Sequence, residues 1–234
     1  MRAVLLAGGR GTRLRPFTTT IPKPLVPVGD IPIMELLLRQ LASYGCDRVT
    51  VAVGHMAQLI MAYFGDGAKW GLSIDYSIED EPLNTIGPLK LIPDLPEYFL
   101  VMNGDLLTDL DMAKLFASHV ESGAVGTVAT YERDVKIDFG VLQYDADRRV
   151  TGFVEKPVEH FSVSMGIYAF SRQILEMVPE GKPFGFDELM IGSVERGLDV
   201  RAYPHDGYWL DIGRPDDYDQ ANRDVDGLIE QVLS

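Results

Sequence analysis

Residues 6–14 combine three glycines and two arginines directly after a short apolar run. Glycine leaves backbone N–H groups open to phosphate oxygens, and the guanidinium groups add positive charge. The segment therefore predicts a phosphate-binding turn, with a purely structural glycine turn as the alternative. It is no Walker loop, because no Gly-Lys-[Ser/Thr] closes it. It also lacks the dinucleotide fingerprint, because Leu14 replaces the third glycine.

Positive charge is concentrated at the start of an otherwise acidic chain. The 234 residues carry a formal net charge of −14, whereas the first 29 contain five basic side chains and no acidic one. This asymmetry predicts an anion site near the N-terminus, with an exposed basic loop as the alternative. The overall negative charge opposes nucleic acid and anionic lipid, so we expect neither as a partner.

Lys23 is the basic residue of this segment whose backbone is most restricted. It lies between Pro22 and Pro24, whose fixed φ angles hold the loop at low entropic cost. This favours a positioned ammonium group over a mobile surface lysine.

These residues and several downstream blocks resemble the sugar-1-phosphate nucleotidyltransferases, also called nucleotide-sugar pyrophosphorylases. The glycine-rich segment followed by Pro-Lys-Pro-Leu resembles the family signature. The further blocks follow in family order at residues 81–89, 103–105, 155–157, 166–168 and 209–213. Pro-Lys-Pro-Leu and the block at 81–89 are most similar to the mannose-1-phosphate and heptose-1-phosphate guanylyltransferase type.

The resemblance implies nucleotidyl transfer, in which a phosphate oxygen of a sugar 1-phosphate attacks the α-phosphorus of a nucleoside triphosphate and pyrophosphate leaves. It implies that Arg13, Lys23 and Asp105 are catalytic and that Asp105 and Asp211 hold Mg²⁺, a cation that prefers carboxylate oxygens. Without the family, each aspartate would be interpreted as an ordinary turn residue. The implied nucleotide-binding residues are Leu6, Ala7, Gly8, Gly9, Gly11, Thr12, Glu81, Asn84, Thr85 and Gly87. The implied sugar-phosphate-binding residues are Gly140, Glu155, Lys156 and Gly166.

The choice of base follows from one acidic residue. Glu81 only accepts hydrogen bonds, which matches the N1–H and N2–H₂ donors of guanine and favours GTP; a solvated loop acid is the alternative. Asn84 and Ile86 stand where the guanylyltransferase type usually has glycine and alanine. Two other functions stay open: a cytidylyl- or uridylyltransferase acting on another sugar, amino-sugar or cyclitol phosphate, and an inactive nucleotide-sugar-binding regulatory paralogue.

Short apolar strands alternate with amphipathic helical stretches, which predicts an α/β fold with a Rossmann-like, mostly parallel sheet and helices on both faces. The expected strands are 2–7, 48–53, 72–78, 98–102, 124–130 and 163–170, and the expected helices are 32–44, 55–64, 111–122, 186–196 and 215–233. An antiparallel hairpin at 140–144 and 149–154 is expected to form a small sugar-binding insertion. Ligands of such sheets bind beyond the carboxyl ends of the strands, here the loops after residues 7 and 102.

We expect a single domain over residues 1–234, with a nucleotide-binding half at 1–130 and a sugar-phosphate-binding half at 131–234 that includes the last helix. No run is long enough for a membrane helix, so no membrane partner is expected. Cys46 is the single cysteine and is interpreted as a buried small hydrophobe in a cytoplasmic protein. A homodimer is expected by family analogy alone, and the four histidines are interpreted as structural.

Overall fold

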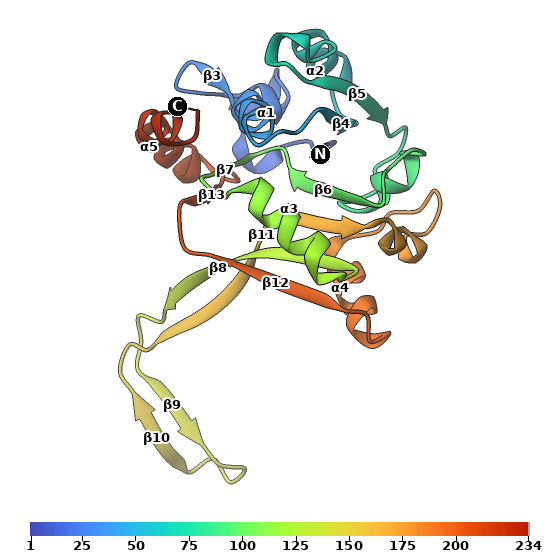
Figure 1. The fold of residues 1–234 in the computed structure, drawn as a ribbon. Coiled ribbons are helices and arrows are strands. Elements are labelled where there is room, and N and C mark those ends of the chain that lie inside the picture. Colours follow the sequence, from blue (N-terminus) through green and yellow to red (C-terminus); the bar gives the residue numbers. More distant parts are fainter. Residues whose placement is uncertain (234) are drawn as a thin grey trace.

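The computed structural model describes residues 1–233 and is built around a seven-stranded sheet (Figure 1). The strands follow the order β12-β8-β11-β6-β1-β4-β5, and only β11 runs antiparallel to its neighbours. Their bounds are Arg2–Ala7 (β1), Arg48–Val53 (β4), Ser73–Ile78 (β5), Tyr98–Asn103 (β6), Gly126–Lys136 (β8), Val158–Ser171 (β11) and Val200–His205 (β12). Both halves of the chain therefore share one sheet.

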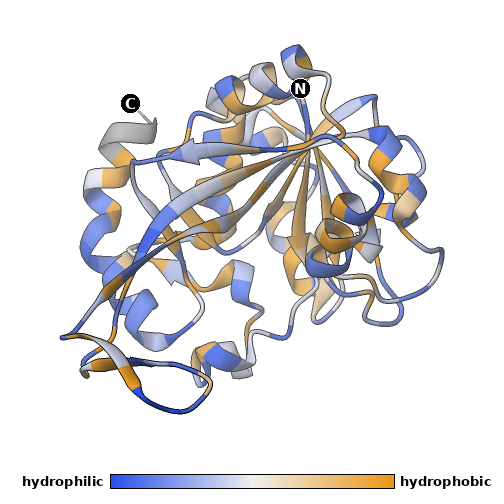
Figure 2. Cartoon of the chain, turned by 90° about the horizontal axis from the view of Figure 1, so that it is seen from below, coloured by the Kyte–Doolittle hydropathy of each residue, from blue (hydrophilic) through white to orange (hydrophobic). Residues whose placement is uncertain are grey.

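Helices cover both faces of this sheet, as the sequence predicts. They are Ile33–Ser43 (α1), Ala57–Phe64 (α2), Met112–Ser122 (α3) and Phe186–Glu195 (α4). The last helix, Pro215–Leu233 (α5), packs against α1 and two of the short strands outside this sheet. One buried cluster joins α1, α2 and α3 to one face, and a second joins α4 and the 3₁₀ turns Gly87–Leu91 and Arg172–Met177 to the other. Figure 2 shows hydrophobic residues gathered along the central strands between these layers. The predicted α/β fold is confirmed.

Three short antiparallel sheets complete the structure. They pair Pro27–Val28 (β2) with Ile31–Pro32 (β3), Leu106–Thr108 (β7) with Trp209–Asp211 (β13), and Val141–Tyr144 (β9) with Val150–Val154 (β10). The predicted hairpin corresponds to β9 and β10. Four further 3₁₀ turns lie at Thr12–Leu14, Phe17–Thr19, Lys23–Leu25 and Ala68–Trp70.

Two strand predictions were too short, and five strands (β2, β3, β7, β12 and β13) were not predicted. β8 and β11 run six and five residues beyond their predicted ends because they pair with each other outside the sheet, where alternating polar residues resemble a loop. β12 contains Pro204, which weakens a strand prediction, but an edge strand tolerates proline. β7 and β13 are three residues each, too short for a periodic signal.

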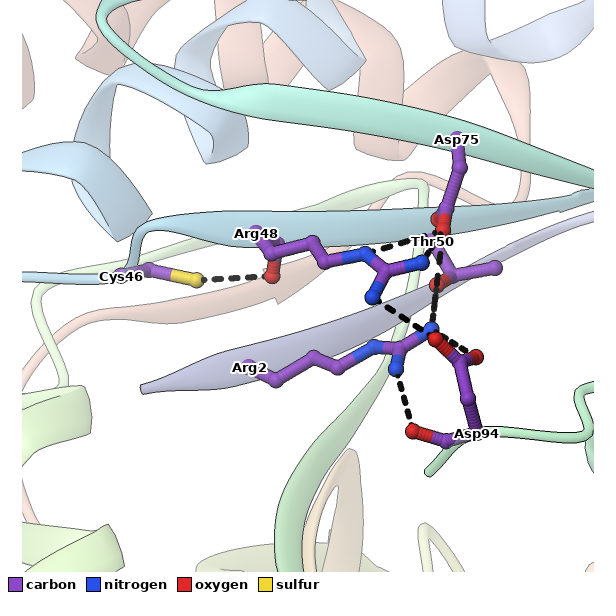
Figure 3. A network of polar contacts seen from close by, with 6 residues as sticks. All are labelled: Arg2, Cys46, Arg48, Thr50, Asp75 and Asp94. Carbon is purple, nitrogen blue, oxygen red and sulfur yellow. Dashed lines mark hydrogen bonds and ion pairs between the residues drawn. The ribbon is translucent and has the colours of Figure 1, made fainter. Parts of the chain in front are cut away.

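The amino ends of β1 and β4 are joined by a cluster of ionic contacts (Figure 3). Arg2 is 7% exposed and donates to the Asp94 carbonyl oxygen at 2.6 Å, to Asp94 Oδ1 at 2.9 Å and to Thr50 Oγ1 at 2.9 Å. Arg48 donates to Asp94 Oδ2 at 2.7 Å and to Asp75 Oδ2 at 2.5 Å. Because ligands bind at the opposite, carboxyl edge of such a sheet, this cluster is structural.

Cys46 is buried at 5% exposure, and burial raises the pKa of its thiol to about 11. It therefore packs as a small hydrophobe, as predicted. Within residues 1–233, no helix has both the length and the apolar character needed to cross a membrane.

Candidate nucleotide and sugar-phosphate site

A cavity of about 400 Å³ opens beyond the carboxyl ends of β1, β4 and β6, the edge that the sequence predicts for ligands. Its walls come from the glycine-rich turn, the loops after β5 and β6, and the loop after β13. The lining residues are Leu6, Ala7, Gly8, Gly9, Gly11, Thr12, Arg13, Lys23, Pro24, Ala52, Glu79, Pro82, Asn84, Thr85, Pro88, Asn103, Gly104, Asp105 and Gly213. Eleven residues that the sequence predicts for the site thus lie together.

The glycine-rich turn is fixed by its own backbone and by one buried anchor. Gly11 has a φ of 59°, a left-handed conformation that favours glycine. Its carbonyl oxygen accepts from Leu14 N at 3.0 Å and from Thr18 Oγ1 at 2.7 Å, and Leu14 is fully buried. The turn is therefore held open toward the cavity.

Arg13 extends from this turn over the end of β13. Its guanidinium carbon lies 3.5 Å from the point where a Cβ on Gly213 would be, so glycine leaves space for it there. Arg13 is exposed to the cavity and forms no ion pair with any residue of the described chain. Its guanidinium group is available to an anion.

Lys23 and Asp105 form an ion pair at the cavity wall. Lys23 is buried at 8% exposure, in the 3₁₀ turn that the flanking prolines support. Asp105 follows β6, and its neighbour Gly104 donates to the Leu6 carbonyl oxygen at 2.9 Å. The ends of β1 and β6 are thereby fixed to each other, which sets the position of the carboxylate.

Asp211 reaches the same place through the unpredicted β7–β13 pair. Asp211 is paired in register with Leu106, and Ile212 N donates to the Asp105 carbonyl oxygen at 3.1 Å. Burial and the nearby Asp105 carboxylate raise the pKa of Asp211, partly offset by Lys23 and Arg13. Asp211 does not line the cavity itself. The fold nevertheless brings its carboxylate close to that of Asp105, which is 106 positions away in the sequence.

Two adjacent carboxylates fit one divalent cation. The Asp211 carboxylate has no hydrogen bond or ion pair to any residue of the described chain, although it is largely desolvated. A cation between it and Asp105 would remove the repulsion that raises its pKa. Across residues 1–233 no group of three or more acidic, histidine or cysteine side chains could hold a metal. Two carboxylates suffice for Mg²⁺, which also takes waters and substrate phosphates as ligands.

Glu79, and not the predicted Glu81, lines the cavity. Glu79 N continues the β5 ladder by donating to the Val53 carbonyl oxygen at 3.0 Å, whereas Glu81 is exposed beyond the strand. Burial raises the pKa of Glu79, and its Oε2 accepts from Leu83 N at 2.9 Å. A Cβ on Gly8 would lie 1.8 Å from Glu79 Oε1, so only glycine leaves space for this carboxylate. The alternation of apolar and polar residues along β5 continues through Glu79, and this pattern could have identified Glu79 as the last residue that pairs with β4.

The two departures from the family pattern have different structural consequences. Asn84 lines the cavity with a φ of 64°, a conformation that asparagine tolerates better than most residues. Ile86 is fully buried in the core and does not face the cavity. Thr85 also lines the cavity, whereas Gly87 packs behind it against the Lys182 carbonyl oxygen.

Three of the four predicted sugar-phosphate residues lie away from the cavity. Gly140, Glu155 and Lys156 are exposed around the β9–β10 hairpin, which Figure 1 shows projecting from the body. A Cβ on Gly140 would lie 3.0 Å from Glu155 Oε2, so these two residues are neighbours within the hairpin. Gly166 is buried beside the Asn103 side chain. Asn103 lines the cavity, whereas Gly166 lies behind it and does not.

The four histidines are not grouped as metal ligands within the described chain. His119 is fully buried between Thr127 Oγ1 at 2.9 Å and Ser171 Oγ at 3.3 Å, and burial lowers its pKa. His160 contacts Asp134 Oδ1 at 2.6 Å on the surface, and His205 contacts Asp109 Oδ1 at 2.8 Å.

Residues 2–227 match the family model described as nucleotidyl transferase. A UTP–glucose-1-phosphate uridylyltransferase of Synechocystis sp. is 36% identical over 96% of this chain and 63% of its own length. A mannose-1-phosphate guanylyltransferase catalytic subunit beta of Drosophila pseudoobscura pseudoobscura is 36% identical over 93% of this chain and 60% of its own length. The chain thus spans about three fifths of the curated relatives it matches.

Solved structures of similar size share the fold. The crystal structure of HddC from Yersinia pseudotuberculosis is 29% identical, with a TM-score of 0.75 over 96% of this chain and 99% of that chain. The same protein complexed with GMP-PN is 28% identical, with a TM-score of 0.73 over the same shares of the two chains.

Proposed function

The chain belongs to the nucleotidyl transferase family, and from this premise we propose that it joins a nucleoside triphosphate, GTP by preference, to a mannose- or heptose-like sugar 1-phosphate. The products are a nucleotide sugar and pyrophosphate. One observation carries the proposal: Arg13, Lys23 and Asp105 line one cavity of about 400 Å³, and the Asp211 carboxylate lies close to that of Asp105.

The chemistry brings two polyanions together, so the protein must neutralise charge and fix geometry. A phosphate oxygen of the sugar 1-phosphate attacks the α-phosphorus in line as the bond to pyrophosphate breaks. Arg13 grips non-bridging oxygens of the triphosphate with its guanidinium fork. Lys23 contacts the transferring phosphate as a point charge. The backbone N–H groups around Gly8, Gly9 and Gly11 bind the other phosphates of the triphosphate.

Asp105 and Asp211 would hold Mg²⁺, which when bound supplies positive charge to the phosphates of both substrates. Their adjacency and the unpartnered Asp211 carboxylate support this assignment. In this arrangement Lys23 neutralises Asp105 before substrates bind and is then available to phosphate oxygens.

The proposed preference for GTP depends on Glu79, which takes over the role inferred for Glu81 because it lines the cavity. A carboxylate beside Gly8 only accepts hydrogen bonds and matches the donor edge of guanine. The relatives include both guanylyl- and uridylyltransferases, so uridylyl transfer to glucose 1-phosphate is the second candidate.

Pyrophosphate release tests the function directly. The protein is incubated with each of the four nucleoside triphosphates, Mg²⁺ and a panel containing mannose, heptose and glucose 1-phosphates. We expect release with GTP and a manno-configured sugar phosphate. Release restricted to UTP with glucose 1-phosphate would establish the second candidate, and no release in any combination would favour a regulatory paralogue.

Thermal unfolding with each nucleotide tests the choice of base independently of turnover. A ligand at 100 times its Kd stabilises the native state by about 2.7 kcal/mol, so a selective nucleotide gives the largest shift. We expect the largest shift with GTP and the loss of this preference in Glu79→Gln. Glu81→Gln is the matched control and should keep the preference.

We further propose that the protein works in the cytoplasm as a homodimer, with residues 1–130 binding nucleotide and residues 131–234 contributing the sugar-phosphate contacts of Gly140, Glu155, Lys156 and Gly166. The buried, unpaired Cys46 thiol supports a reducing compartment.

A further inference from the structure

The cavity has two sides, which the order of the strands defines. Glu79 lies at the carboxyl end of β5, and Asp105 lies just beyond the carboxyl end of β6. The order β11-β6-β1-β4-β5 puts two strands between these two, so β5 and β6 are roughly 14 Å apart. Glu79 therefore marks a β5 side of the cavity, and Asp105 marks the side that faces β11.

The proposed reaction leaves the side that faces β11 to the sugar. The base occupies the β5 side at Glu79, and the triphosphate occupies the glycine-rich turn after β1. In an in-line transfer the attacking oxygen lies opposite the leaving pyrophosphate, so the sugar lies away from this turn. The sugar is therefore placed at the end of β6, where residues 103–105 line the cavity.

Asn103 presents a free side-chain amide on this side of the cavity. It is the last residue of β6, it lines the cavity and it is partly buried. Its amide forms no hydrogen bond with any residue of the described chain, whereas the amide oxygen of Asn84, also in the cavity wall, accepts from Thr85 N at 2.9 Å. An amide offers donors and an acceptor, and a sugar hydroxyl both donates and accepts. The Asn103 amide is therefore available to a sugar hydroxyl.

The neighbouring strand holds this amide in place. Ile167 of β11 is paired with Met102, which puts Gly166 opposite Asn103. Gly166 has a φ of 75° and lies within a shift of the register between β11 and β8. A Cβ on Gly166 would lie 2.5 Å from Asn103 Nδ2, so the glycine leaves the space that the amide occupies. The amide is thus packed between β11 and the cavity.

The carboxylates near Asn103 restrict which hydroxyl can reach it. Asp105 follows Asn103 by two residues. Trp209, which precedes Asp211 by two residues, donates from Nε1 to the Met165 carbonyl oxygen at 3.0 Å. These links hold both carboxylates close to the amide. The phosphate group beside the carboxylates is attached to C1 of the sugar, so the hydroxyl nearest to it is the one on C2.

We propose that the Asn103 amide binds the C2 hydroxyl of the sugar 1-phosphate and thereby selects between sugars that differ at C2. This rests on the proposed function, which it makes more specific. Mannose and glucose differ only in the direction of this hydroxyl, which is axial in mannose and equatorial in glucose. A fixed amide pairs with one orientation, and the other epimer leaves the amide unpaired, which weakens its binding in the transition state. Asn103 thus decides between the two candidate sugars.

The ratio of kcat/KM for mannose 1-phosphate and glucose 1-phosphate tests this role, measured by pyrophosphate release with the nucleotide that supports it. For the unmodified protein we expect at least about a 10-fold preference for one of the two epimers. In Asn103→Ala the preference should fall to within about twofold, while the KM of the nucleotide is unchanged. 2-Deoxyglucose 1-phosphate, which has no C2 hydroxyl, should be used equally well by the unmodified protein and the variant.

Asn84→Gly is the matched control, because it removes an amide from the other side of the same cavity. Leu83 N, directly before Asn84, donates to Glu79 Oε2 at 2.9 Å, which puts Asn84 on the β5 side. Its φ of 64° suits glycine. This variant should change the KM of the nucleotide and keep the epimer preference.

Asn103→Asp is the second variant, used if far-UV circular dichroism finds Asn103→Ala unfolded. It keeps the shape of the side chain and replaces the amide donor by an acceptor, so it should also reduce the epimer preference.

An unmodified protein that uses both epimers equally, or an Asn103 variant that keeps the full preference, would overturn the inference. So would an equal loss of kcat/KM with all three sugar phosphates, because a purely structural role of Asn103 predicts that result. A wrong proposed function gives a different result: the unmodified protein itself then releases no pyrophosphate with any of the sugar phosphates, and both proposals are refuted together.

Discussion

The Lys23 ammonium contacts the Asp105 carboxylate at the cavity wall, although 82 positions separate the two residues in the chain. The β7–β13 pair brings Asp211 close to Asp105 as well. One cation and two carboxylates thus come from three separate segments: a 3₁₀ turn, the loop after β6 and the end of β13. The charge of Lys23 balances only one of the carboxylates, which leaves Asp211 desolvated and unneutralised.

Asp211→Asn is expected to lower the activity and to raise the stability of the protein. We expect at least a 10²-fold loss of pyrophosphate release, the scale of removing one electrostatic stabiliser. In a metal-free buffer the variant should unfold at a higher temperature at neutral pH, because a desolvated charge beside Asp105 is removed.

The sign of the pH dependence follows from the raised pKa of Asp211. The unfolded carboxyl titrates near 3.8, and the folded one takes up its proton at higher pH. The stability advantage of Asp211→Asn is therefore full above the folded pKa and shrinks as the pH falls toward 3.8. Asp216, which follows Asp211 by five residues, has an exposed carboxyl group, so Asp216→Asn should change neither pyrophosphate release nor the unfolding temperature. An Asp211→Asn enzyme with full turnover would remove this residue from the site.

Gly8→Ala is expected to destabilise the cavity wall. A new Cβ would lie 1.8 Å from Glu79 Oε1, so the carboxylate must move and its hydrogen bond from Leu83 N at 2.9 Å is strained. Overpacking of this kind costs about 1–3 kcal/mol. Gly9→Ala is the matched control, since nothing lies within 4 Å of a Cβ there. Urea unfolding of both variants measures the difference, and equal stabilities would contradict the placement of Glu79.

His119 is expected to make the fold sensitive to mild acid. Burial lowers its pKa below the 6.5 of the unfolded imidazole. Its contribution to stability is full above pH 6.5 and decreases as the pH falls from 6.5 to the folded pKa, because the unfolded state binds the proton first. The limiting slope is about 1.4 kcal/mol per pH unit.

Urea unfolding at several pH values below and above 6.5 tests this assignment. His119→Gln should flatten the profile in this range, whereas His55→Gln, at an exposed position, should leave it as it is. A profile that both variants share with the unmodified protein would show that other groups control it.

Arg2→Met is expected to lower the melting temperature, because it removes three hydrogen bonds that tie β1 to Thr50 and to the loop before β6. The hydrogen bond from Arg2 and, to a smaller extent, the one from Arg48 lower the pKa of Asp94 to about 2. NMR titration of the variant should therefore find the Asp94 pKa closer to 3.8. Arg201→Met, which removes an exposed pair with Asp199, is the control and should leave the melting temperature unchanged. An unaltered Asp94 titration would contradict the contacts of Figure 3.

The sequence by itself determined the parts that depend on local spacing. The period of the apolar residues predicted β1, β4, β5, β6 and all five helices to within two residues at each end. The glycines of residues 6–14 and the prolines around Lys23 restrict the backbone where they stand, so the cationic turn at the cavity was predictable before any fold was known.

Only the tertiary structure decided the contacts that depend on register between distant segments. β7 and β13 are too short for a periodic signal, yet their pairing brings Asp211 to Asp105. The end of the β5 ladder, and not the residue type, puts Glu79 in the cavity and leaves Glu81 outside it. Beyond Thr130 the mutual pairing of β8 and β11 carries Glu155 and Lys156, which lie between β10 and β11, away from the body. Local side-chain patterns encode backbone conformation, whereas strand register is fixed by long-range pairing and burial, which no short stretch of sequence contains.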